Sequence, residues 1–276
     1  MSGWTKAHQT VISKIQSAAQ RVLIVEGEDD LDFITALLDN RVGRGAWESQ
    51  WVIGEAGGKD NVMSILAHET GWSGLIDKDE WTPADVAAAR AQHPSRLYVL
   101  PRYCMESYFV VPAELWGLLD DRQRAQLGND AVAFNAALTL ELSRWLRHGV
   151  VWHNINPLWL GLQSVGFQRE LLEFANAQRS DADIESTLIR WHGYLNPAGI
   201  MSKFKADLVV ASGTSDYDKL TTWIHGKRYF DQYLKQELAR LLRLPVKNKA
   251  QSIADLQRTM SVPTDLLPIW AALGLP

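Results

Sequence analysis

Short apolar runs alternate with helical stretches over residues 21–112, and this order is the feature that most constrains the fold of the chain. The apolar runs lie at 21–25, 51–54, 73–76 and 97–100. The first of them, RVLIV, is typical of a strand that is buried on both faces. Helical patterns lie between the runs, at 30–38, 61–69 and 82–92. The order βαβαβαβ predicts an α/β fold with a mostly parallel sheet and helices on both faces.

The chain after residue 112 has a different pattern. Its apolar residues have helical spacing at 113–127, 131–147, 168–178, 183–191, 217–224, 229–242 and 250–259, and no stretch there favours a strand. We therefore expect an α/β domain at 15–112 and a largely helical domain at 113–276. No apolar run approaches the ~20 residues of a membrane-spanning helix. The first 16 residues have an amphipathic pattern without the apolar core of a signal peptide, so we expect a cytoplasmic protein.

Acidic residues directly follow two of the predicted strands. Glu26 and Asp30 follow the first strand in VEGEDD, and Asp77 and Asp79 follow the third in LIDKDE. Because parallel strands end at the same edge of a sheet, we expect these four acids to converge. Taken singly, each group of acids has a simpler explanation. Asp29 or Asp30 could cap the next helix, and Asp77 and Asp79 could lie in a solvated turn. Taken together, they favour a site.

Four carboxylates in one place would repel one another unless a cation neutralised them. Oxygen ligands without histidine or cysteine favour Mg²⁺ or Mn²⁺ over zinc, and the single cysteine, Cys104, excludes a cysteine-based zinc cage. Mg²⁺ usually binds one or two carboxylates together with phosphate oxygens of a substrate. The acids therefore predict a site for divalent ions, with two Mg²⁺ or Mn²⁺ expected, that cleaves a phosphodiester.

The charge distribution favours a polyanionic substrate. Residues 1–112 carry 10 Lys and Arg against 15 Asp and Glu, whereas residues 201–276 carry 11 against 7. A basic C-terminal face would bind nucleic acid, although a solvated helix face has the same composition. The candidate substrate-binding residues are Arg228, Lys235, Arg240, Arg243, Lys247 and Lys249.

The sequence GGK at residues 57–59 precedes a predicted helix and could hold a phosphate. It falls short of a P-loop, so we expect no NTP hydrolysis here, and a tight turn is the favoured interpretation.

Several segments resemble the Toprim family. VLIVEGEDDLDFI and LIDKDE resemble the glutamate and DxD motifs of Toprim domains. MESYFV at 105–110 and HGK at 225–227 resemble the later acidic and lysine motifs of the OLD-like (overcoming-lysogenization-defect) Toprim nucleases. The order of these motifs and the helical C-terminal part are most similar to the Toprim effector subunits of PARIS anti-phage systems. Many Toprim domains have a glycine two residues after the second DxD aspartate, and Trp81 at that position favours the OLD-like branch over topoisomerases and primases.

The resemblance implies roles for the matching residues. Glu26 would be a metal ligand or a general base, and the lysine of HGK would stabilise transition-state charge. The catalytic residues implied are Glu26, Asp30, Glu106 and Lys227, and the metal ligands implied are Glu26, Asp77 and Asp79.

The resemblance also implies a function: a metal-dependent endonuclease effector of anti-phage defence. Such an effector cleaves host RNA, most of all tRNA, when it is released from an ABC-type ATPase sensor partner, and it acts as a homodimer. Two alternatives remain open, a DNA-nicking or DNA-cleaving OLD-like nuclease with the same site and a non-catalytic Toprim-fold binding subunit. A topoisomerase-like reaction would need a nucleophilic tyrosine, and the context singles out none of Tyr103, Tyr108 and Tyr229.

Overall fold

The computed structural model describes residues 3–17, 19–164, 166–167, 171 and 180–276. Its sheet has the strand order β2-β1-β3-β4, and every strand pair is parallel. The strands are β1 (Arg21–Val25), β2 (Trp51–Glu55), β3 (Ser73–Ile76) and β4 (Leu97–Val99). The predicted α/β fold with a parallel sheet is therefore confirmed.

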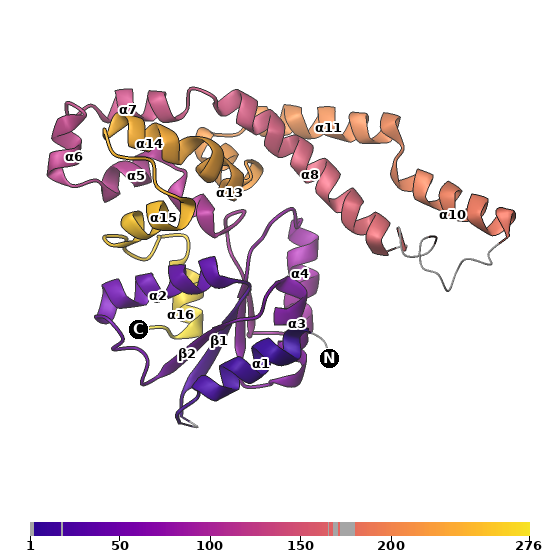
Figure 1. Ribbon diagram of the computed structural model, residues 1–276, viewed down its shortest axis with the longest axis horizontal. Coiled ribbons are helices and arrows are strands. Elements are labelled where there is room, and N and C mark those ends of the chain that lie inside the picture. Colours follow the sequence, from indigo (N-terminus) through magenta and orange to yellow (C-terminus); the bar gives the residue numbers. More distant parts are fainter. Residues whose placement is uncertain (1–2, 18, 165, 168–170, 172–179) are drawn as a thin grey trace. The chain divides into compact units, whose positions relative to one another are not determined.

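Helices cover both faces of this sheet (Figure 1). They are α1 (Gly3–Lys14), α2 (Glu28–Val42), α3 (Lys59–His68) and α4 (Pro83–Gln92). Val22 and Ile24 of β1 belong to one buried cluster with Val11 of α1 and Ile65 of α3. Leu23 and Val25, which alternate with these residues along β1, are equally buried and lie on the opposite face, which α2 covers. A strand buried on both faces explains the uninterrupted apolar run in its sequence.

Contacts divide the chain into two compact units, Met1–Leu140 with His225–Pro276, and Glu141–Ile224. These bounds differ from the predicted domains because the C-terminal segment returns to the α/β sheet, where α15 packs on α2. The first unit also contains η1 (Met105–Phe109), α5 (Pro112–Leu118), α6 (Asp121–Gln126), α7 (Ala131–Leu138), α13 (Gly226–Tyr229), η4 (Phe230–Leu234), α14 (Lys235–Leu241), α15 (Lys249–Gln257) and α16 (Leu267–Leu273). The second contains α8 (Leu142–Ser164), α10 (Asp181–Tyr194), α11 (Pro197–Ser212), α12 (Asp216–Asp218) and η3 (Lys219–Trp223).

Two of the predicted helices are interrupted. The helix expected at 113–127 is α5 followed by α6, because Asp120 begins a new helix by accepting the backbone N–H of Gln123 at 2.7 Å. The helix expected at 131–147 is α7 followed by the start of α8. The sequence patterns missed α11 and α16, and the helix expected at 168–178 lies outside the described residues except for residue 171. No helix within the described part of the chain is long and apolar enough to cross a membrane.

Candidate active site

The carboxyl ends of three strands meet at Glu26. This residue directly follows β1, which lies between β2 and β3 in the sheet. The backbone N–H of Asp77, which directly follows β3, donates to Glu26 Oε1 at 2.8 Å. The N–H groups of Gly57 and Gly58, in the turn after β2, donate to the Glu26 carbonyl oxygen at 2.8 and 2.9 Å. The predicted convergence of Glu26 and Asp77 is therefore present in the structure.

Asp30 is the third residue of α2; it both takes part in the cap at the start of this helix and lines the cavity of the site. Its Oδ2 accepts the backbone N–H of Gly27 at 3.0 Å, so the helix-capping interpretation describes its geometry correctly. The same carboxyl group also lines a cavity together with Glu26. Burial, reinforced by the charge of Glu26, raises the pKa of Asp30 to about 7.

The turn after β4 brings Glu106 to the acids. The backbone N–H of Met105 donates to Asp77 Oδ1 at 3.1 Å, which joins η1 to the end of β3. Glu106 is only 3% exposed. Burial, followed by the charges of Asp30 and Asp79, raises the pKa of Asp77 well above its ordinary value.

The η1 turn is held from behind by Arg102, which is 3% exposed. Its guanidinium group donates to the carbonyl oxygen of Ser107 at 3.1 Å and to both carboxylate oxygens of Glu114 at 2.7 and 2.8 Å. It also donates to Asp265 at 2.7 Å and lies over the Tyr108 ring at 4.2 Å. These contacts fix the turn that carries Glu106.

Asp79 lies in a loop with an unusual backbone. Its φ is 48°, a left-handed value that aspartate tolerates better than most residues. The Asp79 N–H donates to the Tyr103 carbonyl oxygen at 2.7 Å, and the Tyr103 hydroxyl donates to Glu80 at 2.5 Å. Asp79 Oδ2 accepts from Lys59 Nζ at 2.7 Å. The loop after β3 is therefore fixed against both the segment after β4 and the start of α3.

These acids line one cavity of about 440 Å³, which has room for several waters or a phosphate group. Its lining residues are Glu26, Gly27, Glu28, Asp29, Asp30, Asp77, Asp79, Cys104, Glu106, His225 and Lys227. All five acids that the sequence singled out are among them. Glu28 and Asp29, which the sequence analysis gave no catalytic role, add further negative charge.

Two lysines from the C-terminal segment contact this cluster. Lys249 Nζ lies 2.6 Å from Asp29 Oδ2 and 2.9 Å from Glu106 Oε1, and its side chain is 18% exposed. Lys227 Nζ lies farther from the same two acids, at 3.5 and 3.9 Å, and its side chain is 56% exposed. Sequence reasoning assigned Lys227 to the site and Lys249 to a substrate-binding face. The structure brings both to the acids, and Lys249 is the closer.

Close packing at Gly226 brings the HGK segment to η1. A Cβ atom at Gly226 would lie 2.5 Å from Ser107 Oγ and 2.9 Å from the Ser107 backbone nitrogen. No side chain fits there, so glycine allows α13 to approach η1 and carries Lys227 toward Glu106. The two segments that resemble OLD-like motifs are therefore in direct contact.

A third lysine, Lys59, was not among the predicted site residues. It lies 2.7 Å from Asp79 Oδ2 and 3.9 Å from Glu26 Oε1. GGK contains the tight turn that its sequence predicts, in which Gly57 and Gly58 have φ of 79° and 132°. The position of GGK after a strand that ends at the same sheet edge was the signal that could have identified Lys59.

The acids on the two sides of the cavity differ in how far nearby lysines neutralise their negative charge. At the strand ends, burial raises the pKa of Glu26 to about 7, although the charge of Lys59 opposes the shift. On the other side, burial alone would raise the pKa of Asp29, but the hydrogen bonds and charges of Lys249 and Lys227 together outweigh burial and lower it. The strand-end acids are therefore in an environment where an additional cation would be stabilising.

The donor chemistry of the site fits a hard divalent ion. Every acid at the strand ends offers carboxylate oxygens, which are the ligands that Mg²⁺ and Mn²⁺ prefer. Within the described residues, no three His, Cys, Asp or Glu side chains already form a metal-binding group. Mg²⁺ commonly needs only one or two carboxylates because water and substrate supply its other ligands. The fit is therefore one of ligand type and charge.

Three of the other predicted substrate-binding residues are paired with acids, so together they present less positive charge than the sequence suggests. Lys235 pairs with Asp231 at 2.5 Å and Arg240 with Glu237 at 2.7 Å, and Lys247 pairs with Asp255. Arg228 and Arg243 are exposed. Pairing with nearby acids offsets part of the basic charge that the sequence shows.

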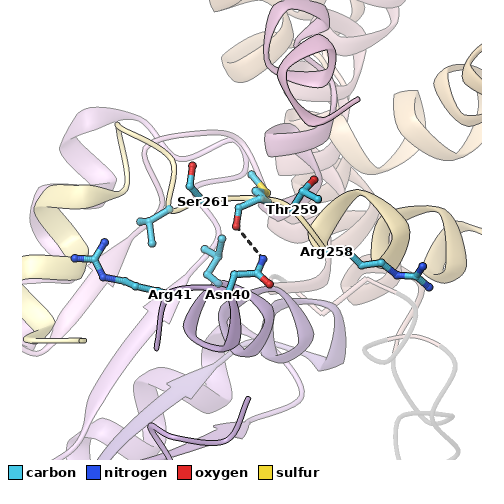
Figure 2. A pocket seen from close by; sticks show the side chains of 8 residues that line it. Asn40, Arg41, Arg258, Thr259 and Ser261 are labelled. Atoms are coloured by element: carbon cyan, nitrogen blue, oxygen red, sulfur yellow. Dashed lines mark hydrogen bonds between the residues drawn. The ribbon is translucent and has the colours of Figure 1, made fainter. Parts of the chain in front are cut away.

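A second cavity of about 280 Å³ lies between α2 and the segment that follows α15 (Figure 2). Asn40 donates to the carbonyl oxygens of Gln257 and Met260 at 2.6 and 2.9 Å. Figure 2 shows Arg41 and Arg258 pointing away from each other, so they do not converge on one ligand. This region anchors the end of α15, the helix that carries Lys249.

The fold and the cavity define a class of protein: an α/β domain with an acidic cavity at the carboxyl edge of its parallel sheet. No model of a known protein family matches this chain, and a search of the curated proteins finds no significant match.

Proposed function

We propose that this chain is a metal-dependent nuclease of the Toprim type and that the acidic cavity is its active site. The observation that carries the proposal is the convergence of acids from the ends of β1 and β3 and from η1 on one cavity beside lysines. Carboxylates favour divalent cations, and lysines favour phosphate. The combination suits hydrolysis of a phosphodiester.

Glu26, Asp77 and Asp79 would hold the divalent ions, Mg²⁺ or Mn²⁺, with two expected. Such ions, when bound, would supply an activated water and neutralise charge on the phosphate. Burial raises the pKa of Glu26 to about 7 in the metal-free protein, so a Glu26 carboxylate that is not bound to an ion would be suited to accept a proton at neutral pH. Asp30, which has a similar pKa, can take or return a proton beside it.

The lysines would act on the phosphate. Lys249 is held by Asp29 and Glu106, so its charge has a fixed position next to the cavity. Lys227 is more exposed and lies at longer distance from the same acids, so it can reorient toward a bound substrate. Positive charge at these positions would stabilise the charge that develops on the phosphate oxygens.

The substrate and the biological setting follow from the resemblance to OLD-like Toprim nucleases and to PARIS effector subunits. On that basis we propose that the chain cleaves host RNA, most of all tRNA, in anti-phage defence. From the same resemblance we also propose that an ABC-type ATPase sensor holds the nuclease inactive, that the active form is a homodimer and that the protein is cytoplasmic.

The test is a cleavage assay with purified full-length chain, tRNA and supercoiled plasmid, each with Mg²⁺ or with EDTA. We expect cleavage of tRNA that requires Mg²⁺ and is lost in Glu26→Gln. Nicking of the plasmid while tRNA stays intact would favour the DNA-cleaving alternative. Binding of either nucleic acid without cleavage in any divalent ion would favour a binding subunit and contradict the proposal.

A further inference from the structure

Lys59 is held inside the carboxylate site by three groups. Its Nζ lies 2.7 Å from Asp79 Oδ2 and 3.9 Å from Glu26 Oε1. It also lies over the Trp81 ring, 4.4 Å from the centroid, at a distance where a cation is attracted to the ring face. Its side chain is 15% exposed, much less than is usual for a lysine. The ammonium group is therefore fixed between two strand ends.

The position of Lys59 in its helix is unfavourable in itself. It is the first residue of α3, where the helix dipole disfavours positive charge. The preceding turn is tied to Glu26 by the N–H groups of Gly57 and Gly58. The acids of the site compensate for the dipole, and a lysine at this position has no other ion-pair partner among the residues that the structure describes.

We propose that Lys59 is a built-in counter-cation of the carboxylate site that competes with a divalent ion for Asp79. This inference rests on the proposed metal-dependent function. A divalent ion bound through Asp79 Oδ2 would share that oxygen with the ammonium group and be repelled by it. Metal binding at Asp79 therefore requires Lys59 to loosen this contact, while the existing contact with the Trp81 ring can continue to stabilise the ammonium group. Lys59 acts through Asp79 and Glu26, so it is a positioning residue.

The experiment measures Mn²⁺ affinity by titration calorimetry at pH 8 and thermal unfolding in EDTA, both on the full chain. Lys59→Met should bind Mn²⁺ about tenfold more tightly than the natural protein, because a like charge near the ion is removed. In EDTA it should unfold at lower temperature, because buried carboxylates lose their partner. Lys59→Arg keeps the charge and should restore weak Mn²⁺ binding. If Lys59→Met does not fold, Lys59→Gln replaces it.

The matched control is Lys78→Met, which removes the same charge from the loop between Asp77 and Asp79. Lys78 lines a different cavity, with Pro83 and Val86, and is not among the residues that line the acidic cavity, so both measurements should change little. Unchanged or weaker Mn²⁺ binding by folded Lys59→Met overturns the competition. If no variant binds Mn²⁺, the proposed function fails. In that case the unfolding temperatures in EDTA still test whether Lys59 is a counter-cation. A lower unfolding temperature in Lys59→Met but not in Lys78→Met supports this role, and equal temperatures for both variants overturn it.

Discussion

Lys249 Nζ lies 2.9 Å from Glu106 Oε1, although 143 residues separate the two in the chain. The contact joins α15 to the η1 turn, and the second contact of Lys249, with Asp29, joins both to α2. The positive charge nearest to Glu106 in this site therefore comes from a helix that sequence reasoning placed on a substrate-binding face.

Lys249→Met should slow cleavage about 100-fold, more than Lys227→Met, because it removes a charge held in place beside the acids. Single-turnover rates and substrate affinities measured separately would show whether the rate falls more than the affinity. Lys219→Met is the control, since Lys219 is as exposed as Lys249, at 18%, but pairs with Asp216 and does not line the cavity. A greater loss of rate in Lys227→Met would reverse the assignment, and equal losses of rate and affinity would make Lys249 a docking residue.

Glu26→Gln should lower the cleavage rate at least about 100-fold while the fold is kept. Glutamine retains an oxygen that can accept the Asp77 N–H, so it is a milder change than alanine for a residue whose side chain is only 17% exposed. Glu55→Gln removes the same charge at the carboxyl end of β2, outside the cavity lining, and should keep full activity. Unfolding temperatures check both folds. Undiminished cleavage by Glu26→Gln would remove Glu26 from the site.

The raised pKa values predict that the chelator-treated protein loses stability as the pH rises. The pKa values of Glu26 and Asp30 rise to about 7 in the folded chain, from ordinary values of 4.5 and 3.8. Between about pH 4 and pH 7 the folded chain therefore binds more protons than the unfolded chain, and these groups make stability fall across that window.

Thermal unfolding from pH 5 to pH 8 would show this fall, and Glu26→Gln and Asp30→Asn should each reduce it. Added Mg²⁺ at pH 8 should recover part of the loss, because the ion stabilises the ionised carboxylates. A fall of the same size in both variants would show that other groups cause it.

Gly226→Ala should destabilise the protein by about 1–3 kcal/mol, because its Cβ would collide with Ser107 in a packed interior. To relieve this collision, α13 would have to move away from η1 and would carry Lys227 away from Glu106, which should also reduce cleavage. Gly117→Ala is the control: Gly117 lies in α5, and its Cβ would meet nothing within 4 Å. Denaturant unfolding compares the two. Similar stabilities would mean that α13 and η1 separate without cost.

The sequence predicted the part of the site that follows from strand order. Glu26 and Asp77 directly follow neighbouring parallel strands, so their convergence needs no long-range information. Local signals also existed where predictions failed: Asp120 and Asn196 are helix-capping residues at the start of α6 and α11. Apolar periodicity through residues 113–127 outweighed the capping signal of Asp120, and the capping signal of Asn196 did not lead to a predicted helix.

The lysines of the site could not be predicted in the same way. The position of Lys249 depends on how α15 docks on α2, through contacts such as those of Asn40 with the end of that helix. Such docking is set by side-chain packing between distant segments and leaves no periodic pattern in either one. Lys59 directly follows a turn whose glycines explain the local backbone by themselves, so its charge had no evident partner in the sequence.

The first compact unit is built from two separate stretches of chain, and this has a consequence for biosynthesis. The strands and their acids leave the ribosome well before α13 and α15, because residues 141–224 are translated in between. During that interval a nascent chain has Glu26, Asp77 and Glu106 but neither Lys227 nor Lys249. Assembly of this cavity is therefore a late event, and translation that stops within residues 141–224 yields the acids without these two lysines.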